Sequence, residues 1–196
     1  MKLPPVILAS VSPRRAELLR ALGVKFEVIP SDATEVHHEH LTATEICQLN
    51  AYRKARVVAK KFPDALVIGA DTLVYLDTTF YGKPATLAEA RRMLGRLQGR
   101  THQVVTGVCL IHLRAHRQKI FAESTEVKFL ARNAKQINHY LSLVNPLDKA
   151  GAYAIQEFGH QLVDHVTGSI SNVVGLPLER LRDELKLWEN APSSLR

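Results

Sequence analysis

Residues 7–15, Ile-Leu-Ala-Ser-Val-Ser-Pro-Arg-Arg, lead from an apolar strand directly into a turn and the start of a helix. Ser12 is a favourable N-cap, and Pro13 suits the first helical position because it has no N–H group to leave unpaired. The N-terminus of this helix offers free N–H groups and the positive end of a dipole, to which Arg14 and Arg15 add charge. This stretch therefore predicts a phosphate-binding turn. A basic first turn on an ordinary helix is the alternative.

Strand and helix patterns alternate along the rest of the chain. Apolar periodicity and capping residues predict further helices over residues 43–61, 86–99, 133–144 and from Pro177 onward. Short apolar runs predict strands over residues 25–30, 65–70, 73–76, 104–113, 120–130 and 161–166, and a loop from 146 running into a strand near 156. A short basic turn joins the runs near Val104 and Ile120, so these two strands form a hairpin. We expect an α/β fold in which helices flank a mixed central sheet.

No linker or internal repeat divides the chain, and residues 1–196 are expected to form a single domain with a polar tail from about 189. Apolar content of 46% and charged content of 23% are typical of a soluble globular protein. The first residues lack the apolar core of a signal peptide, so we expect a cytoplasmic protein. Cys47 and Cys109 stand alone in the sequence, which predicts buried thiols and argues against a zinc site or a disulfide framework.

The formal net charge of +7 has two interpretations, a nucleic-acid surface or a site for a polyanionic small molecule. The basic residues are spread over the predicted helices and do not form a tail. Aromatic residues make up 6% of the chain, and no RNA-binding aromatic signature accompanies the basic residues. Charge alone does not decide between the two.

Asp71 interrupts the apolar segment Val-Ile-Gly-Ala-Asp-Thr at residues 67–72. A carboxylate there is costly unless it faces a cleft, a metal or a partner. Strand ends of this kind line the ligand crevice in α/β proteins. A functional Asp71 is therefore favoured over the alternative, a β-bulge whose aspartate caps the next turn.

Three other residues carry weaker signals. Lys83 lies between Gly82 and Pro84, where a rigid non-helical backbone can direct its charge at a phosphate. Glu35, in the polar loop after the second strand, could complete an oxygen-rich Mg²⁺ site with Asp71. Lys54 lies on the long helix predicted from residue 43. For each of the three, a solvated side chain is the alternative interpretation.

Several common templates are absent from the sequence. A Walker A loop, a GxGxxG fingerprint and a GxSxG elbow do not occur. The histidines of the loop have neither helical spacing nor an HExxH pattern, so we interpret this segment as a polar loop and not a zinc site: His37, His38 and His40.

Taken in order, seven segments resemble the Maf family of nucleoside triphosphate pyrophosphatases: residues 9–15, 51–55, 69–72, 82–84, 101–104, 146–153 and 174–177. The resemblance covers nearly the whole chain. It implies a two-lobed fold around a cleft, related to the inosine triphosphate pyrophosphatases, and a homodimer. No apolar run is long enough for a membrane helix, so we expect no membrane partner, and we expect no nucleic-acid partner either. It also implies cleavage of a nucleoside triphosphate to the monophosphate and pyrophosphate with Mg²⁺ or Mn²⁺, in a house-cleaning role.

The resemblance assigns roles to individual residues. Asp71 would act as metal ligand and proton acceptor, and Glu35 would help to hold the divalent cation. The residues implied at the phosphates are Ser10, Ser12, Arg14, Arg15, Lys54 and Lys83, with Lys149 as a further candidate.

Three positions distinguish the branches of the family, and here they are Arg14, Thr72 and Gln156. This combination is similar to the branch that acts on dTTP and UTP, whereas the branch that acts on 7-methyl-GTP has Trp, Gln and Glu. A glutamine amide can donate to and accept from a pyrimidine edge.

Two residues depart from the family pattern. Asn50 stands where a small or apolar residue is usual, and Glu157 follows Gln156 where glycine is common. Glu157 adds negative charge near the implied base pocket. This charge affects the expected order of preference among nucleotide substrates more than the expected reaction. Two alternatives stay open: the same reaction on another modified nucleotide, and a non-enzymatic regulator that binds nucleotide or DNA.

Overall fold

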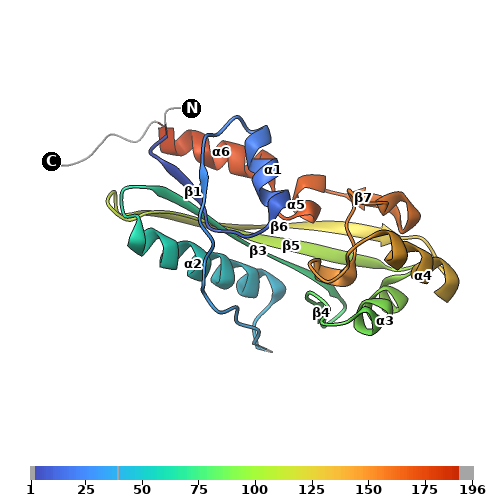
Figure 1. The fold of residues 1–196 in the computed structure, drawn as a ribbon. Helices are drawn as coiled ribbons and strands as arrows, with labels where there is room; N and C mark the ends of the chain where they lie inside the picture. Colours follow the sequence, from blue (N-terminus) through green and yellow to red (C-terminus); the bar gives the residue numbers. More distant parts are fainter. Residues whose placement is uncertain (1–2, 39, 190–196) are drawn as a thin grey trace. The chain divides into compact units, whose positions relative to one another are not determined.

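The computed structural model describes residues 3–38 and 40–189. The chain forms an α/β fold built on a mixed sheet (Figure 1), as predicted. It divides into two units. The first comprises the residues up to Asp71, Thr106–Glu123 and the residues from Gly175 onward, and the second comprises Thr72–Val105 and Ser124–Val174. The predicted polar tail beyond residue 189 lies outside the described residues.

The helices are α1 (Pro13–Ala21), α2 (Ala43–Lys61), α3 (Leu87–Leu97), α4 (Ala134–Leu143), α5 (Ile170–Val174) and α6 (Leu178–Glu189), with 3₁₀ turns η1 (Ala150–Ala152) and η2 (Gly159–Gln161). The strands are β1 (Val6–Leu8), β2 (Glu27–Val28), β3 (Leu66–Leu76), β4 (Thr79–Tyr81), β5 (Thr101–His112), β6 (Arg117–Phe129) and β7 (Val163–Thr167). Their order in the sheet is β2-β1-β3-β5-β6-β7, and β4 pairs with β3. Strand β1 is parallel to β2 and β3, whereas β4 and β7 are antiparallel to their neighbours.

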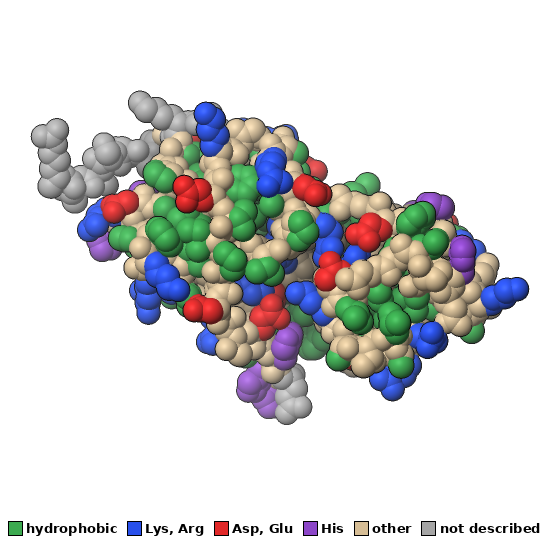
Figure 2. Space-filling model, viewed as in Figure 1, with side chains coloured by type: hydrophobic (Ala, Val, Ile, Leu, Met, Phe, Trp, Pro, Cys, Tyr) green, Lys and Arg blue, Asp and Glu red, His purple; other side chains and the backbone are tan. Residues whose placement is uncertain are grey.

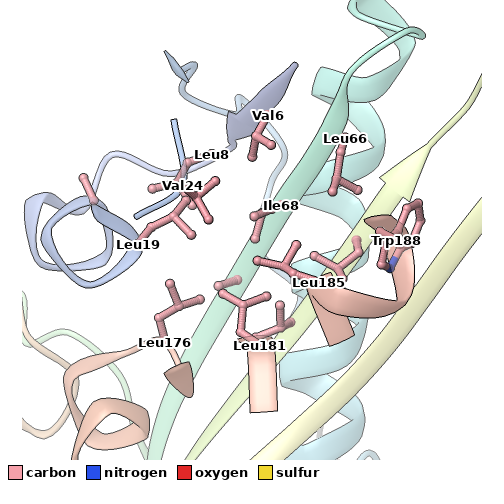
Figure 3. Close-up of a cluster of buried hydrophobic side chains, with 14 of the residues drawn as sticks. Val6, Leu8, Leu19, Val24, Leu66, Ile68, Leu176, Leu181, Leu185 and Trp188 are labelled. Carbon is pink, nitrogen blue, oxygen red and sulfur yellow. The ribbon is translucent and has the colours of Figure 1, made fainter. Parts of the chain in front are cut away.

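In the first unit, helices cover both faces of the sheet, with α2 on one face and α1 and α6 on the other (Figure 1). Because side chains alternate along a strand, each strand packs against the helices on both faces of the sheet. Leu8 and Ile68 point toward α1 and α6, where they pack against Leu19 and Leu181 (Figure 3). Neighbouring strand residues such as Val67 point the other way and pack under α2.

Helix α2 lies directly against the sheet because two glycines leave room for its backbone. A Cβ atom at Gly69 would lie 2.4 Å from the carbonyl oxygen of Ala51, and one at Gly107 would lie 2.4 Å from that of Cys47. Since side chains alternate along β3, the residue two positions after Gly69 faces the same helix. That residue is Asp71.

The core of the second unit contains a buried histidine. The Nε2 atom of His102 lies 2.8 Å from the hydroxyl oxygen of Tyr153, and its ring packs edge-on against Phe129. Burial lowers the pKa of His102 to about 4. His102 is therefore neutral in the folded protein at neutral pH.

We expect His102 to make stability depend on pH. Its pKa is lower in the folded state than its ordinary value of 6.5, so the unfolded chain takes up the proton first as the pH falls. Its contribution to the free energy of unfolding is therefore complete above pH 6.5 and is lost as the pH falls toward 4, by up to about 3 kcal/mol. Urea unfolding across this range, with wild type and His102→Phe compared, measures the effect. Equal pH slopes in the two proteins would contradict it.

Most predicted elements are confirmed, and the local signals explain why. Thr42 and Asn133 form complete capping boxes at the starts of α2 and α4. Ser12 is the N-cap residue of α1, although its hydroxyl makes no cap hydrogen bond, and Gly23 after that helix has a left-handed φ of 71°. The two cysteines are buried thiols, as predicted, and burial raises the pKa of Cys109 to about 12.

The structure corrects several boundaries. Strand β3 runs without a break through Asp71, and the hairpin turn comes later, at Asp77. Strand β2 is shorter than predicted, and the sequence analysis missed β4 and α5. The strand expected near residue 156 is absent. The chain instead forms η1, where Gly151 and Ala152 both have positive φ angles, and then a turn at residues 156–158. Among residues 3–38 and 40–189, no helix is both long and apolar enough to cross a bilayer.

Candidate active site

Asp71 is a nearly buried carboxylate whose two oxygens both accept hydrogen bonds. Its Oδ1 accepts from the Nζ of Lys54 at 2.7 Å, and its Oδ2 accepts from the Nδ2 of Asn50 at 3.1 Å. Asn50 and Lys54 are one helical turn apart on α2, so they present their side chains on the same face. A charge that is 5% exposed is tolerated here because donors surround it.

Glu35 reaches the same ammonium group from a different segment. Its Oε1 lies 2.6 Å from the Nζ of Lys54. Glu35 belongs to residues 31–38, which form neither helix nor strand and run alongside α2. Lys54 thus joins two carboxylates that are far apart in the sequence.

The turn between β1 and α1 is held together by hydrogen bonds of its own. The hydroxyl of Ser10 is buried and accepts from the backbone N–H of Ser12 at 3.2 Å and from the guanidinium of Arg15 at 3.3 Å. The Nε of Arg15 donates to the carbonyl of Gly175 at 2.9 Å, which links the start of α1 to the segment before α6.

Arg15 also interacts electrostatically with the carboxylates. Burial lowers the pKa of Arg15, the negative charges of Asp71 and Glu35 raise it, and the positive charge of Arg14 lowers it. The guanidinium stays protonated at neutral pH in any case. The basic turn and the carboxylates therefore share one electrostatic environment, with three cations (Arg14, Arg15 and Lys54) and two anions.

The two carboxylates fit a divalent cation of the Mg²⁺ type. Mg²⁺ in nucleotide sites is held by one or two carboxylates, with substrate phosphates and water as its other ligands. Glu35 and Asp71 converge on one positively charged group, the Lys54 ammonium. In the described part of the chain, no three His, Cys, Asp or Glu side chains gather as a metal site does. Two carboxylates are within the number of protein ligands that such Mg²⁺ sites use.

The histidines predicted to lie in a polar loop are found at its end. The Nε2 of His37 lies 3.9 Å from the Oε2 of Glu35, and the rings of His38 and His40 are 5.2 Å apart.

The remaining predicted residues belong to the second unit. Lys83 and Gln156 are exposed, and Thr72 is partly buried directly after Asp71 on β3. The N–H of Gly151 donates to the carbonyl of Gly82 at 3.1 Å. This bond joins the segment that carries Lys83 to the turn that precedes Gln156.

Lys149 is buried and has three acceptors around its ammonium group. It is 4% exposed, and its Nζ lies 2.7 Å from the carbonyl of Asn145, 2.8 Å from Asp148 and 3.1 Å from Glu157. An ammonium has three donors, and these acceptors account for all of them. A phosphate contact would require Lys149 to give up one of these partners, so the structure favours a role in holding its own loop. Glu157, predicted to add charge beside the base pocket, is paired with this lysine.

Sequence reasoning missed the role of Asn50. Residue 50 lies on the apolar stripe of α2, together with Ile46, Cys47 and Ala51, and it is 1% exposed. A polar residue on such a stripe needs a buried partner. That mismatch was the available signal, although it does not identify Asp71 as the partner.

The surface charge is mixed on the face drawn in Figure 2. Lys and Arg side chains lie singly or in small groups among Asp and Glu side chains there. That face does not carry the continuous basic stripe that is typical of nucleic-acid binding.

Comparisons with known proteins find matches over most of the chain. The model of the family described as "Maf-like protein" matches residues 5–188. A dTTP/UTP pyrophosphatase of Akkermansia muciniphila is 46% identical over 184 residues, which cover 94% of this chain and 95% of that protein. A dTTP/UTP pyrophosphatase of Symbiobacterium thermophilum is 47% identical over 176 residues, 89% of each chain.

A solved structure shows the same fold at lower similarity. The Ham1 protein of Staphylococcus aureus superposes with a TM-score of 0.53 at 15% identity, covering 93% of this chain and 98% of that one.

Proposed function

This chain belongs to the Maf family, and we propose that it is a nucleoside triphosphate pyrophosphatase that hydrolyses dTTP and UTP to the monophosphate and pyrophosphate. One observation carries the proposal more than any other: Glu35 and Asp71 converge on the ammonium of Lys54. The basic turn between β1 and α1 shares their electrostatic environment. The relatives named above are dTTP/UTP pyrophosphatases, which supports the same substrates here.

In this proposal the first unit supplies the chemistry. Asp71 accepts the proton of the attacking water and directs its lone pair at phosphorus. Ser10, Arg14, Arg15 and Lys54 hold the triphosphate and stabilise the leaving pyrophosphate. Ser12 is a further proposed phosphate ligand, because its hydroxyl makes no cap hydrogen bond in α1.

A divalent cation, Mg²⁺ or Mn²⁺, held by Asp71 and Glu35, would neutralise charge that develops on the phosphate oxygens.

The second unit supplies the residues proposed to recognise the base. In this unit Thr72 and Gln156 are the proposed specificity residues, and Lys83 is a further phosphate ligand. Arg14 is proposed as the third specificity residue. The pairing of Lys149 with Glu157 fixes the residue next to Gln156 and neutralises its charge. A carboxylate at 157 therefore leaves the amide of Gln156 as the group offered to a pyrimidine edge.

We predict that Gln156→Glu shifts the enzyme away from pyrimidine nucleotides. A carboxylate only accepts hydrogen bonds, so it cannot donate to the O4 atom of uracil or thymine. We expect kcat/KM for UTP and dTTP to fall about tenfold or more relative to GTP. Steady-state kinetics with several nucleotides measure this ratio, with Gln118→Glu as the matched control at an exposed residue of β6. Unchanged ratios in Gln156→Glu would remove this residue from base recognition.

The experiment that tests the function is an assay of pyrophosphate release across canonical and modified triphosphates, with Mg²⁺ and with Mn²⁺. Release from UTP and dTTP supports the proposal. Release confined to a modified nucleotide would keep the reaction and overturn the assignment of the specificity residues. Binding of nucleotide without any release would favour the non-enzymatic regulator.

We also propose that the protein acts as a homodimer, as the family resemblance implies, and that it works in the cytoplasm. Sedimentation velocity of the purified chain measures the oligomeric state, and a monomer at micromolar concentration would contradict the dimer.

A further inference from the structure

Three residues of α2 form hydrogen bonds with the loop that carries Glu35. The Nε of Arg53 donates to the carbonyl of Thr34 at 3.2 Å, and the Nζ of Lys54 binds Glu35 itself at 2.6 Å. The side chain of Asn50 binds the backbone of the next residue, Val36. Residues 50, 53 and 54 lie on one face of the helix, so three successive loop residues are held by a single surface.

The amide of Asn50 makes three hydrogen bonds. Its Oδ1 accepts from the N–H of Val36 at 2.8 Å, while its Nδ2 donates to the Val36 carbonyl at 3.1 Å and to the Oδ2 of Asp71 at 3.1 Å. Only this orientation of the amide satisfies all three. A flipped amide would place its NH₂ against an N–H and its oxygen against two acceptors.

The amide of Asn50 therefore contacts the Asp71 carboxylate and the backbone of the residue that follows Glu35. It orients Asp71 directly, and it fixes the backbone immediately after Glu35. It does so without charge, so it does not compete with a cation for either carboxylate. Because the side chain is 1% exposed, water cannot readily replace these bonds.

We propose that Asn50 is a positioning residue that couples the Glu35 loop to the Asp71 carboxylate, so that the two carboxylates present their oxygens to one divalent cation. Its effect on turnover rests on the proposed function. Its effects on the loop and on cation binding do not.

The first test is made without nucleotide. In Asn50→Leu we expect amide hydrogen exchange at Val36 to speed up at least tenfold, because its acceptor is lost. We expect the affinity for Mn²⁺, measured by titration calorimetry or electron paramagnetic resonance, to fall about tenfold, the usual effect of removing a group that orients metal ligands. Gln48→Leu makes the same amide-to-leucine change at a half-buried position of α2 and should alter neither quantity.

A second variant, Asn50→Asp, distinguishes the loss of specific hydrogen bonds from a general loss of folding in Asn50→Leu. Asn50→Asp keeps the shape and the acceptor for the Val36 N–H, but it places an oxygen against the Val36 carbonyl and Asp71. A folded Asn50→Asp protein should retain most of the Val36 protection. If wild-type Val36 exchange and Mn²⁺ affinity persist in Asn50→Leu, the proposal is overturned.

The coupling itself is tested in a Glu35→Gln background. If Asn50 acts through the loop, the loss of Mn²⁺ affinity on Asn50→Leu should shrink from about tenfold to under threefold there. An equal loss in both backgrounds would overturn the coupling. Altered exchange and Mn²⁺ affinity in a protein that releases no pyrophosphate would keep this inference while the proposed function fails.

Discussion

Asp71→Asn is expected to lower kcat for UTP by about a thousandfold or more, while the dissociation constant for the nucleotide changes only severalfold. An amide keeps the shape of the carboxylate but cannot take a proton from water. Asp71 lies on β3 with both oxygens fixed, one by Lys54 and one by Asn50. Its geometry therefore suits a base whose direction is set before the substrate arrives.

Stability must be measured beside this activity. The new amide brings an NH₂ group against a donor, either Asn50 or Lys54, and a lost buried hydrogen bond costs about 1–3 kcal/mol. Single-turnover rates are therefore compared in protein shown by circular dichroism to be folded.

Asp77→Asn is the matched control. Asp77 is an exposed aspartate in the β3–β4 turn, paired with Arg100, and asparagine tolerates its left-handed φ of 55°. Wild-type kcat in Asp77→Asn with near-wild-type kcat in Asp71→Asn would remove Asp71 from the mechanism.

Lys54→Met should have the second largest effect. The Lys54 side chain is 14% exposed and its ammonium lies between Glu35 and Asp71, so its removal leaves two carboxylates without the cation that joins them. We expect the free energy of unfolding in EDTA to fall by about 3 kcal/mol, the lower end for breaking a buried ion pair, because Glu35 is partly exposed. The kcat/KM for UTP should fall at least about a hundredfold, since the variant also lacks a charge for the triphosphate.

Added Mg²⁺ gives this prediction a further test. A divalent cation can replace the missing charge between the carboxylates, so Mg²⁺ should restore part of the lost stability in Lys54→Met. Lys61→Met is the control, because Lys61 at the end of the same helix is exposed and lies 3.7 Å from an exposed Asp32. Its expected change in stability is within about 0.5 kcal/mol. If both lysine variants behave alike, the central role of Lys54 is wrong.

The elements that could be predicted from the sequence are those whose signals are local. Ser12, Pro13 and Gly23 mark the two ends of α1, and Thr42 marks the start of α2, because capping depends on a few neighbouring residues. The segment of η1 could not be predicted in this way. Its Ala152 has a φ of 65°, a conformation that alanine adopts only where tertiary contacts enforce it.

In the candidate site, too, some residues could be predicted from local sequence, whereas others depend on tertiary contacts. Asp71 could be singled out from the sequence because a carboxylate interrupts an apolar run there, and the resemblance to the Maf family pointed to Glu35 and Lys54. The roles of Asn50 and Lys149 depend on partners that only the folded chain brings near, namely Val36 and Asp71 for one and Glu157 for the other. A side chain's partners across different segments are set by the fold and not by local sequence.

The most direct test of the central claim is a ³¹P NMR measurement of the products that the wild-type protein forms from UTP with Mg²⁺. Hydrolysis at the α–β phosphoanhydride predicts equal amounts of UMP and pyrophosphate, with no signal of UDP. UDP with inorganic phosphate, or unchanged UTP after prolonged incubation, would contradict the account.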